Sequence, residues 1–182
     1  DCSEFELMAG LAEAISRRDP KDARNRRLYA QALIEAGKAT AAIDLLQVLA
    51  RRLAETDPEY AEVRGLVGRA YKQIFIDARD KGVAYVREAL KKAIEAYRDP
   101  YQLDPRNVWH GVNLLALLER ARAIGLRAAP ELDGQVLAKQ LMATLEATPA
   151  DQRNAWFPAM LAEVSLGLRD WNAIDHSVQQ YV

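Results

Sequence analysis

The chain has 182 residues, of which 25 are basic and 26 are acidic, so its formal net charge is −1. This balance argues against a protein that binds nucleic acid or an anionic membrane surface. Half of the residues are hydrophobic, no run of 18 apolar residues occurs, and the single cysteine, Cys2, cannot form an internal disulfide. We therefore expect a folded cytoplasmic protein with neither a membrane span nor a need for an oxidising compartment.

Apolar residues follow a helical period along the whole chain, and no segment shows the alternation of a half-buried strand. One face of a leading helix carries Phe5, Met8, Leu11 and Ile15. One face of a later helix carries Ile43, Leu46, Leu49 and Leu53. The nine glycines and seven prolines are expected between such segments rather than inside them. This pattern predicts an all-α fold of about nine helices, paired into helical hairpins after the leading helix.

The hairpins resemble one another, and the clearest unit is the segment 59–106. Its two predicted helices carry Gly68, Tyr71, Ala93 and Tyr97, and Pro105 follows the second. A small residue with an aromatic residue a few positions later, in both helices, is typical of the tetratricopeptide repeat. The small residues let two helices approach closely, and the aromatic rings fill the space beside the contact. This unit is therefore predicted to be a tetratricopeptide-like helical hairpin.

The same template fits the neighbouring segments. It predicts a single repeat domain, an α-α superhelix, with a leading helix at 1–19 and repeat units at 25–58, 59–106, 107–149 and 150–182. In the first unit the template positions fall on Ala30, Leu33, Ala42 and Leu46, and Gly37 ends the first helix. In the third unit Leu115 stands where a small residue is expected, and in the fourth Gly167 is placed in the turn before Trp171.

The second unit is longer than the template. Gly68 and Ala93 lie 25 positions apart, whereas about 12 positions separate the corresponding residues of a usual repeat. The extra residues include Ile74, Phe75, Ile76, Val83, Tyr85 and Val86, which continue the helical period on both sides of Asp80-Lys81-Gly82. We interpret them as about two extra turns on each helix, with a long loop as the alternative.

An ordered series of motifs resembles a known family. It comprises Gly65–Lys72, the long insertion, Ile94–Tyr97, Asp104–Asn107, Gly111–Leu115 and Leu161–Val164. The series is similar to the TRAFs-binding, tetratricopeptide-like region of the apoptosis signal-regulating class of MAP-kinase-kinase-kinases and of its bacterial relatives, over residues 25–182. The resemblance implies a regulatory scaffold outside any catalytic domain, and the Ala-rich and Arg-rich composition favours the bacterial relatives.

No arrangement of residues indicates an enzyme, a metal site or a cofactor. The two histidines, His110 and His176, are far apart in the sequence and lack cysteine or carboxylate neighbours at metal-ligand spacing. Cys2 has no base or orienting group nearby, and nucleophile-elbow and phosphate-loop motifs are absent. Basic pairs such as Arg51-Arg52 are interpreted as a solvated helix face. We expect no catalytic residue, no metal and no cofactor.

A binding surface is instead expected from the repeats themselves, because stacked hairpins form a concave groove lined by the first helix of each unit. Alignment of the units on Ala30, Gly68 and Leu115 directs seven residues toward this groove: Arg27, Gln31, Arg69, Lys72, Gln73, Trp109 and Asn113. Basic and amide side chains suit an acidic peptide or a terminal carboxylate. Alternatively, each of these residues is an ordinary solvated side chain without a binding role. Asn113 has a further alternative, because its amide can form a hydrogen bond with a neighbouring backbone carbonyl.

Two functions fit these observations. The first is a non-catalytic scaffold that binds a protein or peptide, as a module of a larger signalling, regulatory or defence protein. The alternative is a self-association module of a multidomain enzyme or defence protein, in which the lengthened hairpin and the terminal helices form a homo-oligomer. The apolar residues Trp171, Val178, Tyr181 and Val182 of the last helix favour this alternative, because they need a cover.

Overall fold

The computed structural model of the protein describes residues 2–78 and 82–181. The side chains of residues 2–6, 180 and 181 are outside the described part. The predictions for the side chains of Cys2, Phe5 and Tyr181, and those for Asp80, Lys81 and Val182, therefore lie outside the described residues.

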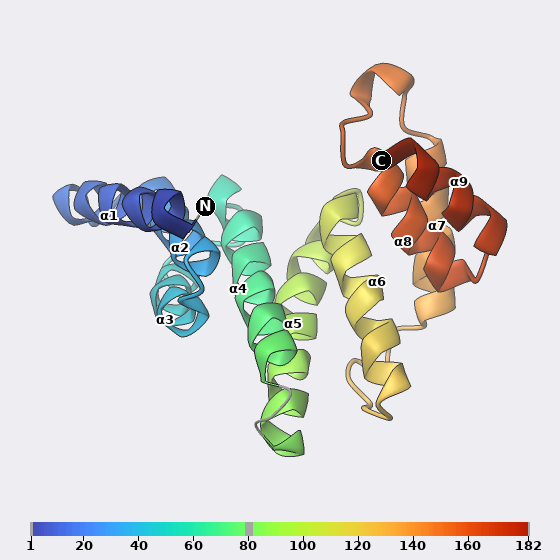
Figure 1. The fold of residues 1–182 in the computed structure, drawn as a ribbon, viewed down its shortest axis with the longest axis horizontal. Coiled ribbons are helices and arrows are strands. Elements are labelled where there is room, and N and C mark those ends of the chain that lie inside the picture. Colours follow the sequence, from blue (N-terminus) through green and yellow to red (C-terminus); the bar gives the residue numbers. More distant parts are fainter. Residues whose placement is uncertain (1, 79–81, 182) are drawn as a thin grey trace. The chain divides into compact units, whose positions relative to one another are not determined.

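The described residues form nine α-helices and one short 3-10 helix, and no strand (Figure 1). The helices are α1 (Cys2–Arg18), α2 (Ala23–Glu35), α3 (Ala39–Ala50), α4 (Pro58–Asp77), α5 (Val83–Leu103), α6 (Val108–Ala123), α7 (Gly134–Glu146), the 3-10 helix η1 (Ala150–Gln152), α8 (Phe157–Leu168) and α9 (Trp171–Tyr181). The predicted all-α fold with a leading helix is confirmed. The pair α2/α3 begins two residues before the predicted unit 25–58 and the pair α4/α5 one residue before the predicted unit 59–106.

The chain divides into two compact units, one up to Ala96 and one from Tyr97 onward. The division falls inside α5, where Pro100 is buried within the helix. The expectation that the glycines and prolines lie between helices is wrong at this position and at several glycines, among them Gly10 in α1 and Gly111 in α6. Proline has no N–H, so the carbonyl of Ala96 receives no helical hydrogen bond from it, and the hydrogen-bond ladder of α5 is interrupted at the division. The assignment of the chain to one repeat domain stays a prediction.

In the first unit each helix packs against the next, from α1 to α4, and α2 also packs against α4. The core contains Ala30, Ala42, Leu46, Val63 and Ala70, all of them fully buried. Ala30 and Ala42 are the small residues that the repeat template placed at helix contacts. Their burial agrees with the expected close approach of helices, because a larger side chain would separate the backbones.

The helix ends follow from local sequence. Five of the described helices begin after a residue whose side-chain oxygen accepts a backbone N–H, and these residues are Asp22, Asp57, Asn107, Asp133 and Asp170. Gly37 ends α2 in the left-handed conformation, with φ of 73°. The next N–H, that of Lys38, donates to the Leu33 carbonyl at 2.8 Å. This is the hydrogen-bond pattern of a glycine-terminated helix, and it confirms the predicted end at Gly37.

The lengthening of the second hairpin is confirmed as helical. Helices α4 and α5 have 20 and 21 residues, whereas α2 and α3 of the preceding hairpin have 13 and 12. The difference of seven residues between α4 and α2 is about two helical turns. The alternative of a long loop is therefore wrong.

In the second unit α6 packs against α7 and α8, α7 against α8, and α8 against α9. The small residue of the third repeat is Gly111 and not position 115. A Cβ built on Gly111 would clash with the Leu141 side chain and would lie 2.7 Å from Cε2 of Tyr101. Leu115 instead faces Gly167, which lies in α8 and not in the predicted turn.

Candidate protein-binding surface

The seven predicted groove residues are divided between the two units. Arg27 and Gln31 lie on α2, and Arg69, Lys72 and Gln73 lie on α4. These two helices pack against each other in the first unit. Trp109 and Asn113 lie on α6, in the second unit. We call the five residues on α2 and α4 the α2–α4 face.

Two ion pairs join α2 to α4 across this face, with opposite polarity. Arg27 Nε of α2 donates to Glu59 Oε2 of α4 at 2.5 Å, and both side chains are largely buried. Arg69 Nη1 of α4 lies 2.8 Å from Glu35 Oε1 of α2, in a more exposed pair. Each helix therefore contributes one cation and one anion, and the two pairs hold the helices in one register.

These carboxylates change the electrostatics that the sequence predicted. The face is basic in the sequence-based alignment, but Glu59 and Glu35 neutralise Arg27 and Arg69 in the structure. Sequence reasoning missed both acids because they lie far from their partners in the chain. A signal was present nonetheless: Glu59 follows Arg27 by 32 positions, close to the repeat length of about 34 residues.

The remaining residues of the face are polar and partly exposed. Gln73 Nε2 donates to Asp77 Oδ1 at 2.8 Å, one turn further along α4. Lys72 is partly buried, and Gln31 lies partly buried beside an apolar hollow between α1 and α2. The face therefore presents two amides, an ammonium and two paired guanidinium groups.

In the second unit Trp109 belongs to an aromatic cluster. Its ring meets the buried Tyr97 edge to face, with ring centroids 5.7 Å apart, and 41% of Trp109 remains exposed. Asn113 Nδ2 donates to the Trp109 backbone carbonyl at 2.9 Å. This hydrogen bond corresponds to the alternative interpretation of Asn113, in which its amide binds a backbone carbonyl. It uses one of the amide's hydrogen-bond donors within α6 itself. His110 is fully buried and contacts both rings, which agrees with a structural histidine.

The hollow between α1 and α2 has a volume of about 310 Å³. It is lined by Met8, Leu11, Ala12 and Ile15 of α1 and by Asn25, Leu28, Gln31 and Ala32 of α2. Met8, Leu11, Ile15 and Leu28 are each more than 40% exposed. The apolar face predicted for the leading helix is thus open to solvent, and we call this site the α1–α2 hollow.

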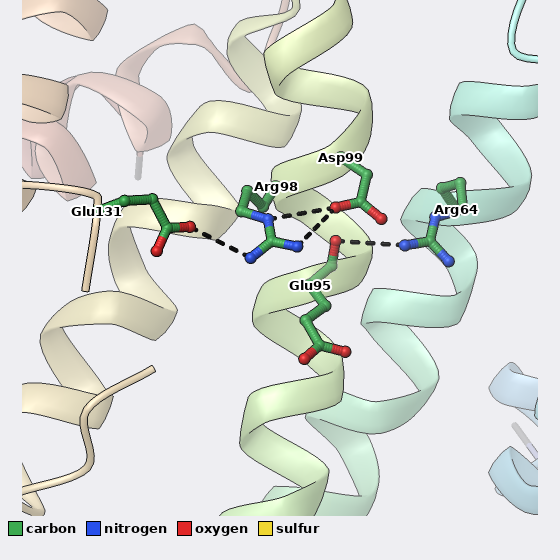
Figure 2. A network of polar contacts seen from close by, with 5 residues as sticks. All are labelled: Arg64, Glu95, Arg98, Asp99 and Glu131. Atoms are coloured by element: carbon green, nitrogen blue, oxygen red, sulfur yellow. Dashed lines mark hydrogen bonds and ion pairs between the residues drawn. The ribbon is translucent and has the colours of Figure 1, made fainter. Parts of the chain in front are cut away.

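Polar contacts on the lengthened hairpin and beyond it are shown in Figure 2. Arg64 Nη2 of α4 donates to the Glu95 carbonyl of α5 at 3.3 Å. In the second unit, Arg98 donates to Asp99 at 3.1 Å and to Glu131 at 3.2 Å. Glu131 lies in the connection between α6 and α7, so Arg98 ties this loop to the end of α5 (Figure 2).

Among residues 2–78 and 82–181, no group of three or more His, Cys, Asp or Glu residues is placed to hold a metal ion. In the same part of the chain, none of the helices has the length and apolar character needed to span a membrane.

These features define an all-helical repeat protein of the tetratricopeptide type. A family model described as Tetratricopeptide Repeats-Sensor matches residues 4–118, so the chain belongs to this family. A thermophilic TPR protein from Thermus thermophilus has a similar crystal structure, with a TM-score of 0.70 and 16% sequence identity. The similarity covers 98% of this chain and 82% of that one, and it confirms the α-α repeat fold. No curated protein matches the chain.

Proposed function

We propose that the protein is a non-catalytic scaffold that binds an acidic protein or peptide segment through the α2–α4 face. Tetratricopeptide folds generally mediate contacts between proteins and generally lack catalysis. The single observation that carries the proposal is that two ion pairs, Arg27–Glu59 and Arg69–Glu35, join α2 to α4. Gln31, Lys72 and Gln73 belong to the same face. The two ion pairs hold two guanidinium groups in fixed positions among further hydrogen-bond donors.

A guanidinium group that has formed one ion pair can still donate hydrogen bonds to a second carboxylate. Arg69 Nη1 contacts Glu35, and 39% of the Arg69 side chain is exposed. A guanidinium group has five N–H donors, so its outer N–H groups can donate to a carboxylate of a partner. Because Glu35 and Glu59 lie close by, an incoming acid meets a compensated surface, and the binding is expected to be moderate and sensitive to salt.

The biological context belongs to the same proposal. The protein is proposed to be a cytoplasmic module of a larger signalling or regulatory protein. The word sensor in the family name and the resemblance to the TRAFs-binding region support this role. Self-association is the second candidate, and a specific observation favours it. Trp171 and Val178 of α9 are 65% and 46% exposed, so the last helix presents apolar surface for a second chain.

The test is a pull-down from a lysate of the source organism with the wild-type protein and the variant Arg69→Glu/Lys72→Glu. We expect a captured protein that is lost with the variant, because the charge of the face is reversed. A matched control is the exchange Glu35→Arg/Arg69→Glu, which keeps an ion pair between α2 and α4 but moves the cation. If the Glu35→Arg/Arg69→Glu variant loses the partner while its melting temperature is unchanged, the result supports a direct contact between Arg69 and the partner. A partner retained by both variants contradicts the proposed face.

A further inference from the structure

A second hollow in the first unit is lined mainly by polar side chains. It lies between α3 and α4 and has a volume of about 210 Å³. Six residues line it: Gln47, Ala50, Arg51, Tyr60, Arg64 and Val67. Four of them carry hydrogen-bond donors on their side chains, and none of the six is an acid. The hollow, which we call the α3–α4 pocket, therefore has the donors and the positive charge to hold an anion.

The helical period and the packing of α3 on α4 bring these residues together. The three from the end of α3 stand at positions i, i+3 and i+4, and the three from α4 at i, i+4 and i+7, so each set shares one face of its helix. The two helices pack against each other, and the two faces meet at the pocket. Arg51 and Arg52 are both exposed, as the sequence pattern predicts, but only Arg51 also lines the pocket.

Contacts within the first unit hold polar side chains of the pocket in place. Arg64 Nη2 donates to the Glu95 carbonyl of α5 at 3.3 Å (Figure 2), and Gln47 Nε2 donates to the Tyr71 hydroxyl of α4 at 2.9 Å. A guanidinium group has five N–H donors and a primary amide has two, so a partner at one donor does not exhaust either group. Among the described residues, Arg51 has no ion-pair partner.

We propose that the α3–α4 pocket binds a phosphate monoester, whose charge is matched by the guanidinium groups of Arg51 and Arg64. The Tyr60 hydroxyl and the Gln47 amide add neutral donors. A phosphate monoester carries nearly two negative charges at neutral pH and three acceptor oxygens, and guanidinium groups fit these oxygens with paired N–H donors. A carboxylate has one charge and two oxygens, so it would use only part of the pocket. The same chemistry occurs in a phosphorylated side chain of a protein and in a small phosphate ester.

This site goes beyond the proposed partner binding at the α2–α4 face. Tyr60 and Arg69 lie nine positions apart on α4, which is about two and a half helical turns. They are therefore on opposite sides of α4, and a ligand in the α3–α4 pocket leaves the α2–α4 face open. Phosphate binding is measured on the purified protein without a protein partner, so failure of one proposal is distinguishable from failure of the other.

The first experiment is a titration of the full chain with inorganic phosphate, followed by NMR of the arginine side-chain and backbone N–H groups at constant ionic strength. We expect saturable binding with a dissociation constant of about 1–10 mM. Arg51→Gln should weaken binding about tenfold, the change expected when a charged hydrogen-bond donor is lost. It should fold as the wild type does, because Arg51 is exposed.

The matched control is Arg52→Gln, which removes the same charge from the neighbouring exposed residue. Its dissociation constant should stay within about twofold of the wild-type value, since salt screens a charge outside the pocket. Tyr60→Phe removes only the hydroxyl and should weaken binding about threefold. Absence of saturation up to about 50 mM phosphate, or an equal loss of affinity in Arg51→Gln and Arg52→Gln, overturns the proposal.

The second experiment identifies the source of the phosphate group. The wild type and Arg51→Gln are titrated with a short phosphoserine peptide, with the same peptide lacking phosphate, and with glycerol 2-phosphate. Tighter binding of the phosphopeptide than of glycerol 2-phosphate, lost in Arg51→Gln, supports a phosphorylated protein as the ligand. Tighter binding of glycerol 2-phosphate supports a small phosphate ester. Equal affinity for the peptide with and without its phosphate, together with no binding of glycerol 2-phosphate, overturns the proposed phosphate site.

Discussion

Leu115 of α6 packs directly against the backbone of Gly167 in α8. A Cβ built on Gly167 would lie 2.9 Å from Cδ2 of Leu115 and 3.3 Å from its Cγ. Leu115 is 1% exposed, so its side chain has little room to move away. The Leu115 side chain on α6 therefore fills the space that a side chain at position 167 of α8 would need.

Gly167→Ala is expected to destabilise the protein because the new methyl group occupies the space of Leu115. Overpacking of this kind costs about 1–3 kcal/mol in the free energy of unfolding, partly offset by the higher helix propensity of alanine. Urea unfolding followed by circular dichroism measures the loss. In the Gly167→Ala background, Leu115→Val should cost less than it does in the wild type, since it removes part of the clash.

Gly10→Ala is the matched control for this prediction. Gly10 also lies inside a helix, but a Cβ there would meet nothing within 4 Å. The substitution should leave the protein unchanged or stabilise it by up to about 1 kcal/mol. Equal losses at Gly10 and Gly167 would contradict the role assigned to the Leu115 contact.

The fold was largely predictable because it depends on short-range patterns. The helical period of Ile43, Leu46 and Leu49 corresponds to residues that are all buried in α3, and the glycine at Gly37 ends α2 as expected. Pro100 was missed because the repeat template gives no sign that a proline will be kept within the last turn of a helix. Gly111 was missed because the alignment puts the small position one turn later, at Leu115, and Gly167 was missed because it was expected in the turn before Trp171 and not inside α8.

The candidate site was less predictable, for a physical reason. Periodicity fixes the face on which Arg27 or Arg69 lies, but it does not say which side chain of the next repeat lies opposite. The neutralising acids Glu59 and Glu35 are brought close only by the packing of α2 on α4. Whether the α1–α2 hollow is open to solvent depends on which segments pack against α1. The amphipathic pattern of α1 itself does not predict these neighbours.

Arg27→Ala is expected to cost about 1–3 kcal/mol in unfolding free energy, because it leaves the largely buried Glu59 carboxylate without its cation. The double variant Arg27→Ala/Glu59→Ala should lose less than the sum of the two single variants. The corresponding cycle for the more exposed pair of Arg69 and Glu35 should give a smaller coupling energy. Chemical denaturation of the four single and two double variants measures the two coupling energies. Equal coupling energies for the two ion pairs would contradict the prediction.

Asp104 follows α5 and is expected to titrate at unusually low pH. Hydrogen bonds from the Arg106 side chain, and then from its backbone N–H, lower the pKa of the Asp104 carboxyl. Because the folded pKa lies below the unfolded one, the stability from this contact is present above the unfolded pKa and is lost as pH falls through the folded pKa. Carboxyl NMR titration should give a lower midpoint in the wild type than in Arg106→Gln. Identical midpoints would show that the side-chain contact is absent in solution.

Arg98 is expected to restrain the connection between α6 and α7. Its guanidinium group contacts Glu131 in this loop and Asp99 in α5, so Arg98→Ala removes the ion pair that ties the two segments together. Amide hydrogen exchange in residues 124–133 should become about threefold to tenfold faster, the change expected when a partly exposed pair is lost and local opening becomes easier. The matched control is Lys92→Ala, which removes an ion pair with Glu88 inside α5 and should leave exchange in the loop unchanged. Exchange that is equally fast in the wild type and in Arg98→Ala would mean that backbone packing alone holds the loop, and the contact with Glu131 would then have no restraining role.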